Sequence, residues 1–153
     1  MNKKRKNILI SMCLVGVSCR YNATPSSVSI PTEIFSKYNL IPVCPEQLGG
    51  LTTPRSPAEI QTGDGSDILL GIAEIINKNN DNVTDNFIFG AKETLKLAKK
   101  FQAKCFIGQP ESPSCSCCKI HDGTFSGKLK PGIGVTAALL RENGIKTLEP
   151  TSC

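Results

Sequence analysis

Three apolar segments that each run into a cysteine constrain the fold more than any other feature of this sequence. "ILIS" precedes Met12 and Cys13, "LIPV" precedes Cys44, and "CFIG" leads through a short loop to Cys115. Short apolar runs next to turn-forming residues are typical of buried strands. The carboxyl ends of parallel strands meet at one edge of a sheet, which is where open α/β folds gather their ligands. The pattern therefore predicts three cysteines side by side at one edge.

Helical patterns separate these strands. The segment 83–102, "VTDNFIFGAKETLKLAKKFQ", has apolar residues at helical spacing and Thr84 as the expected N-cap. A second helix is expected in "GIGVTAALLRENG", where Gly144 is placed to end it, and a last short strand follows. "EIFSKYN" is expected to form a further short helix. The expected apolar face of the first helix comprises Phe87, Ile88, Ala91, Leu95, Ala98 and Phe101.

The middle of the sequence has less clear patterns. Residues 45–65 are rich in proline and glycine and are expected to be a long loop, whereas residues 68–77, "ILLGIAEIIN", are strand-like. The alternation of strands and helices predicts one compact α/β domain, Rossmann-like, with a mainly parallel sheet flanked by helices. We place it at residues 7–149, between a basic tail, 1–6, and a C-terminal tail, 150–153.

The charge of the chain is concentrated at its start. The net charge is +5, and the basic residues from Lys3 to Lys6 supply most of it. The rest of the chain is nearly neutral and offers no broad basic face for a phosphate backbone. We therefore expect no nucleic-acid partner, and the sequence makes no prediction of oligomeric state.

The first apolar run also resembles the start of a bacterial lipoprotein, with Cys19 as the acylated residue. Two features argue against that interpretation. Gly16 stands where such signals usually carry leucine, and removal of residues 1–18 would delete the first strand together with Cys13. We therefore expect a cytoplasmic protein without membrane attachment.

Eight cysteines in 153 residues indicate a chemical role for some of them. Thiolates are soft ligands that suit zinc, cuprous copper or iron–sulfur clusters. The paired spacing of structural zinc knuckles is missing, so a cluster or an active site is favoured. Cys105, inside "AKCFIG", is expected to be a small buried hydrophobic residue.

Several motifs together identify a family. "SMCLVGVSCRY", "PVCPEQLGGLTTPRSPAE", "SPSC" and "DGTFSG" followed by "GVTAALLRENGI" resemble, in order, the bacterial family catalogued as domain of unknown function 523. The resemblance runs from about residue 7 to about residue 148. It implies a small cytosolic α/β protein similar to thiouracil desulfidases, which hold a [4Fe–4S] cluster on three cysteines and leave the fourth iron open. Carried over by motif, the ligands are Cys13, Cys44 and Cys115.

The resemblance implies an enzyme that removes sulfur from a small thiolated nucleobase such as 2-thiouracil and releases hydrogen sulfide. An open iron would polarise the C–S bond as a Lewis acid, and water would add at carbon. Glu46 is the expected catalytic carboxylate, with a solvated loop carboxylate as the alternative, and Ser112 is preferred to Ser114 for a proton relay. His121 is expected in a loop and is given no role.

The chain departs from the family pattern around "SPSC". Ser116 follows Cys115 where the family usually has glycine, and a lysine usual before the motif is missing. Cys117 and Cys118 add two thiols next to the expected ligand. The alternative hypothesis is a non-catalytic iron–sulfur or zinc-binding protein in which one of these two completes the coordination.

Overall fold

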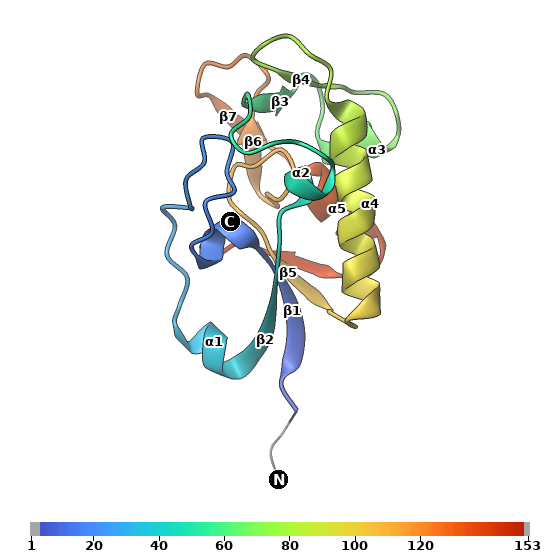
Figure 1. The fold of residues 1–153 in the computed structure, drawn as a ribbon. Helices are drawn as coiled ribbons and strands as arrows, with labels where there is room; N and C mark the ends of the chain where they lie inside the picture. Colours follow the sequence, from blue (N-terminus) through green and yellow to red (C-terminus); the bar gives the residue numbers. More distant parts are fainter. Residues whose placement is uncertain (1–3, 152–153) are drawn as a thin grey trace.

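A four-stranded parallel sheet forms the centre of the molecule (Figure 1). The computed structural model describes residues 4–151. All three pairings in the sheet are parallel, and β1 lies between β2 and β5. The α/β fold with a parallel sheet, predicted from the sequence, is confirmed. In spatial order the strands are β2 (Tyr38–Val43), β1 (Lys6–Ser11), β5 (Cys105–Ile107) and β8 (Lys146–Leu148).

The two faces of this sheet are covered by different parts of the chain. Leu9 packs on one face with residues of α4 (Thr84–Lys100) and α5 (Val135–Glu142). Ile10, the next residue, points to the opposite face and packs with η1 (Met12–Val15) and with Ile34 of α1 (Glu33–Lys37). Because side chains alternate along a strand, one short apolar run fills both cores.

The inner position of β1 bears on the lipoprotein hypothesis. β1 is hydrogen-bonded to a neighbour on each side, and both Leu9 and Ile10 are fully buried. Removal of residues 1–18 would therefore take an inner strand out of the sheet. Within residues 4–151, no helix is both long and apolar enough to cross a membrane.

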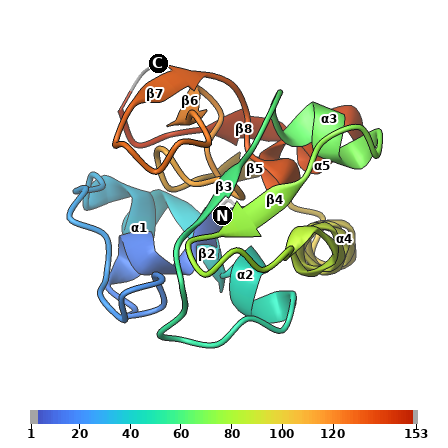
Figure 2. The ribbon, with the colours of Figure 1, turned by 90° about the horizontal axis from the view of Figure 1, so that it is seen from above.

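Two small antiparallel sheets lie beyond the carboxyl ends of the main strands (Figures 1 and 2). One pairs β3 (Ala58–Ile60) with β4 (Ile75–Asn77), and the other pairs β6 (Lys119–His121) with β7 (Leu129–Pro131). They share a core with α4 and α5. This core includes Ile60, Ile75, Phe87, Ile120 and Val135. The carboxyl edge of the parallel sheet is thereby covered.

The predictions for the middle of the chain were partly wrong. The expected loop 45–65 contains α2 (Pro45–Leu48) and β3, and the expected strand 68–77 is divided between α3 (Gly65–Leu69) and β4. Asp64 explains the start of α3. Its Oδ1 accepts the backbone N–H of Ser66 at 2.9 Å, and its own N–H is bonded to Asp67 Oδ2 at 2.8 Å. This capping box outweighs the strand-like composition that follows.

The long helix α4 is placed as predicted, but its ends differ in detail. Val83 occupies the N-cap position, and Thr84 is the first helical residue. The hydroxyl of Thr84 instead accepts the N–H of Ile75 at 2.9 Å and so ties the helix to β4. Phe101 lies past the last turn with 46% of its surface exposed, so it is not part of the buried face. Gly144 follows α5 with a φ of 75°, as expected for a helix-ending glycine.

Candidate metal centre

Cys13, Cys44 and Cys115 lie around one cavity at the carboxyl edge of the parallel sheet. Cys13 is in η1, directly after β1, and Cys44 follows β2 at the start of α2. Cys115 lies in the loop between β5 and β6 (Lys119–His121). All three line a cavity of about 450 Å³. The strands that precede them are neighbours in the sheet, so the parallel topology alone brings the three thiols together, as the sequence pattern predicts.

The three thiols are largely shielded from water. Cys13 and Cys115 are each 6% exposed, and Cys44 is half-buried. Burial raises the pKa of the Cys115 thiol to about 12, because the charged form loses its hydration. The Sγ of Cys13 lies 3.5 Å from the amide oxygen Oε1 of Gln109. A bound metal supplies the positive charge that a buried thiolate needs.

A fourth thiol, that of Cys19, lies in the same cavity and was not predicted as a site residue. Cys19 is 2% exposed and lines the cavity with the other three. A hydrogen bond with Cys13 raises the pKa of Cys19 to about 11. The pKa of Cys44 is also raised, first by a hydrogen bond with Cys19 and then by burial. The sequence signal for this position of Cys19 was the glycine between the two cysteines of "CLVGVSC". Gly16, at a φ of 96°, lets the chain turn back after η1.

Cys117 and Cys118 form a separate group outside this cavity. Their Sγ atoms are 3.7 Å apart, and the carboxylate of Glu149 completes a set of potential ligand atoms within 4.8 Å of one another. Neither cysteine is among the described residues that line the 450 Å³ cavity. The structure therefore gives Cys19, and not these two, the position of a possible fourth thiol.

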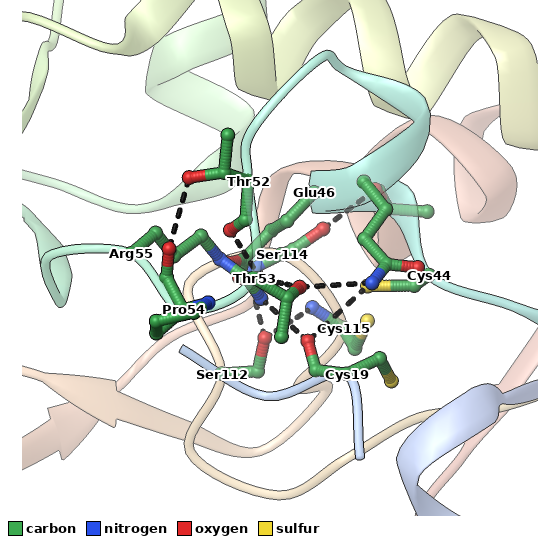
Figure 3. A network of polar contacts seen from close by, with 12 residues as sticks. Cys19, Cys44, Glu46, Thr52, Thr53, Pro54, Arg55, Ser112, Ser114 and Cys115 are labelled. Atoms are coloured by element: carbon green, nitrogen blue, oxygen red, sulfur yellow. Dashed lines mark hydrogen bonds and ion pairs between the residues drawn. The ribbon is translucent and has the colours of Figure 1, made fainter. Parts of the chain in front are cut away.

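Glu46 lies on the cavity wall in an ion pair with Arg55 (Figure 3). It stands in the first turn of α2, two residues after Cys44. Its Oε2 accepts a hydrogen bond from Arg55 Nε at 2.7 Å, and the two side chains are only 16% and 8% exposed. The alternative of a solvated loop carboxylate does not describe this position.

Ser112 and Ser114 have different positions in the turn that leads to Cys115 (Figure 3). Ser112 lines the cavity, and its Oγ accepts the backbone N–H groups of Ser114 at 3.1 Å and Cys115 at 3.0 Å. The Ser114 hydroxyl, 1% exposed, pairs instead with Thr136 Oγ1 of α5 at 2.9 Å. Of the two hydroxyls, Ser112 is the one at the cavity.

The cavity is also lined by residues to which the sequence analysis assigned no role. His121, expected in a loop, ends strand β6 and lines the cavity. Its Nε2 lies 3.9 Å from Glu111 Oε2, and its buried Nδ1 has no hydrogen-bond partner in the structure. A lone histidine without a motif gives no signal of such a position. Further lining residues are Arg20, Tyr21, Glu59, Lys78 and Phe125.

Comparisons with known proteins agree with this architecture. The family model described as 2-thiouracil desulfurase matches residues 8–151. The protein YbbK of Bacillus subtilis (strain 168), described as uncharacterized, is 43% identical over 141 residues, which are 92% of this chain and 93% of YbbK. A solved structure of the [4Fe-4S]-dependent thiouracil desulfidase TudS superposes with a TM-score of 0.83 at 31% identity. That match covers 95% of this chain and 91% of the TudS chain.

Proposed function

The chain belongs to the 2-thiouracil desulfurase family, and we propose that it is a cytoplasmic desulfidase that removes sulfur from a small thiolated pyrimidine such as 2-thiouracil. The observation that carries the proposal is the arrangement of Cys13, Cys44 and Cys115 around one cavity, with Glu46 and Ser112 on its wall. Water supplies the oxygen that replaces sulfur, and sulfur leaves as hydrogen sulfide. The reaction is therefore a hydrolysis without net oxidation or reduction.

The donor set fits a [4Fe–4S] cluster. Cys13, Cys44 and Cys115 follow three separate strands and line a cavity of about 450 Å³, whereas a structural zinc site is usually built from closely paired cysteines. Cluster irons are held by thiolates. We assign these three thiols as the ligands, which leaves one iron without a protein ligand among them. When bound, such a cluster supplies a Lewis-acidic iron for the soft sulfur of a thiocarbonyl.

Glu46 and Ser112 move protons in this proposal. The Oε2 of Glu46 is occupied by Arg55, and in the part of the chain that the structure describes no side-chain hydrogen bond reaches Oε1. Oε1 is thus the oxygen available to take a proton from an attacking water. The Ser112 oxygen accepts two backbone N–H groups, so its own hydrogen is free to be donated into the cavity.

Two features support a small-molecule substrate. The charge of the chain outside Lys3 to Lys6 is close to zero, which does not favour a nucleic acid. The cavity wall also carries aromatic and cationic groups near the cysteines, among them Tyr21, Phe125 and Arg20. Aromatic faces suit stacking with a flat heterocycle, and cationic groups suit its carbonyl oxygen.

The alternative function is a non-catalytic iron–sulfur protein, and Cys19 is the observation that favours it. A fourth thiol in the same cavity would complete the coordination of all four irons. Such a cluster would lack an iron open to substrate.

The test is anaerobic purification with iron reconstitution, followed by an absorption spectrum, iron and zinc analysis, and a 2-thiouracil turnover assay on the same sample. We expect about four irons per chain, as for a [4Fe–4S] cluster, together with uracil and sulfide in equal amounts. A full cluster without turnover on any thiolated pyrimidine would favour the non-catalytic alternative. Zinc in place of iron would overturn the proposal.

A further inference from the structure

Arg55 connects more parts of the candidate site than any other described side chain. Its Nε donates to Glu46 Oε2 at 2.7 Å, and its Nη2 donates to the backbone oxygen of Cys19 at 3.0 Å. Its Nη1 donates to Thr52 O at 3.1 Å and to Thr53 Oγ1 at 3.0 Å. The side chain is 8% exposed. A guanidinium with this many hydrogen bonds is held in one orientation.

The backbone of Arg55 adds a further connection. Its N–H donates to the backbone oxygen of Tyr21 at 2.8 Å. Arg55 thus holds two segments to each other: the loop that runs from Cys13 to Tyr21, and the start of α2 with Cys44 and Glu46 (Figure 3). These segments carry two of the three assigned ligands.

The geometry also restricts the orientation of the Glu46 carboxylate. Because Arg55 Nε binds Oε2, the carboxylate cannot rotate freely about its last bond, and Oε1 keeps one direction. The ion pair is largely shielded from water, which makes it stronger than an exposed pair. A lysine at this position would keep the charge but not the planar set of donors.

We propose that Arg55 is a positioning residue for the desulfidase reaction, acting through Glu46. Its guanidinium holds the Glu46 carboxylate in the direction that the attacking water needs, while Thr52, Thr53 and the Cys19 carbonyl hold the guanidinium. This inference rests on the proposed function and assigns to Arg55 a role that differs from substrate binding. Arg55 itself exchanges no proton and touches no reacting atom.

The experiment is a double-mutant cycle on the iron-loaded full chain, with Arg55→Gln, Arg55→Lys, Glu46→Asp, and Glu46→Asp combined with Arg55→Gln. Iron per chain and the absorption spectrum are measured first, then kcat and KM for 2-thiouracil. Arg141→Gln is the matched control, because that guanidinium is also hydrogen-bonded, through two donors to Thr147 Oγ1, and does not line the cavity.

We expect Arg55→Gln to keep its iron and to lose roughly 100-fold in kcat, the scale of a misplaced catalytic group, with little change in KM. Arg55→Lys should lose less in kcat than Arg55→Gln but should not reach the wild-type value. The control Arg141→Gln should keep the wild-type kcat. The double variant should lose much less than the product of the two single losses, because both changes disturb one carboxylate.

Three results with the variants would overturn the inference. A kcat loss in the double variant equal to the product of the two single losses would show that Arg55 acts independently of Glu46. A rise in KM alone in Arg55→Gln would make Arg55 a substrate-binding residue. Loss of iron in Arg55→Gln would make it a support for the cluster. An iron-loaded wild-type protein without turnover would overturn the proposed function, and this inference with it. The wild-type protein is assayed first, so this outcome is known before any variant is compared.

Discussion

The side-chain oxygen of Ser112 accepts the backbone N–H of Cys115 at 3.0 Å, so one hydroxyl lines the cavity and also fixes the turn that presents a ligand thiol. Two functions thus meet in one small side chain. Alanine removes the hydroxyl and threonine keeps it, so kcat and the free energy of unfolding, measured separately, report on the two functions.

Ser112→Ala is expected to lower kcat by about 100-fold, the lower end of proton-transfer contributions. It should also lower the free energy of unfolding by about 1 kcal/mol through the lost hydrogen bonds. Ser112→Thr should keep most of the activity. Ser114→Ala is the control, since that hydroxyl pairs with Thr136 and lies outside the cavity lining. Equal loss of kcat in the Ser112 and Ser114 variants would contradict the assignment of the relay.

Replacing any one of Cys13, Cys44 and Cys115 by serine should abolish stable cluster binding, because a hard hydroxyl is a poor ligand for iron in a cluster. Cys105→Ser is the matched control, a half-buried cysteine of β5 that does not line the cavity. Iron per chain after anaerobic gel filtration is the measurement. Retention of iron by a Cys44→Ser protein would remove that residue from the ligand set.

Cys19→Ser should keep its iron, because three ligands remain. Turnover should continue as well, since the open iron stays accessible. If instead the protein loses iron as readily as Cys115→Ser, Cys19 is a fourth ligand and the non-catalytic alternative gains support. Cys117→Ser, outside the cavity lining, is the comparison and is expected to resemble the wild-type protein in iron content.

Gly108→Ala tests the close packing beneath the Cys115 turn. A Cβ at Gly108 would overlap the backbone oxygen of Cys115, although the backbone of Gly108 itself is not in the left-handed region. The turn must shift, and we expect both a loss of roughly 1–3 kcal/mol in stability, as for overpacking, and a lower iron content. Gly71→Ala has open space around the added Cβ but a φ of 77°, so it should lower stability through backbone strain alone and leave the iron content unchanged. Urea unfolding and iron analysis of both variants provide the comparison.

The turn after β6 provides a pH-dependent contribution to stability. The hydroxyl and N–H of Thr124 donate to Asp122, and these hydrogen bonds lower the pKa of the Asp122 carboxyl. Because the folded pKa lies below the unfolded value of about 3.9, the contribution is present above that value and is lost as the pH falls through the folded pKa. NMR titration of the carboxyl carbon should show a lowered pKa that moves back toward the ordinary value in Thr124→Ala. An unchanged pKa in that variant would exclude Thr124 as its cause.

The parallel sheet and its three cysteines were predictable because the signal is local. Each of the three apolar runs ends close to a cysteine, and parallel topology then places the cysteines at one edge without further information. The position of Glu46 at the cavity was predictable for a similar reason, since it follows Cys44 by two residues. The sequence supported only a preference for Ser112 over Ser114. The hydrogen bonds of the turn show that the Ser114 hydroxyl pairs with Thr136, whereas Ser112 lines the cavity.

The remaining features depend on contacts that the sequence pattern does not encode. Cys19 reaches the cavity because the chain reverses at Gly16, and the pairing of Arg55 with Glu46 depends on the path of a loop rich in proline. The small sheets have strands of three residues, too short for a periodic signal. At α3 the capping box of Asp64 competed with an apolar run, and the local hydrogen bonds prevailed.

The inner position of β1 has a consequence for the order of events during synthesis. Cys13 and Cys44 leave the ribosome before the neighbour β5 and the turn with Cys115, which follow only after the long helix α4 has been made. Until then β1 lacks one of its partners, and the thiols of Cys13 and Cys44 have no third member beside them. Loading of a cluster on the three proposed ligands must therefore wait until the Cys115 turn has been made, so the supply of iron and sulfide has to meet a chain in which β1, β2 and β5 are all present.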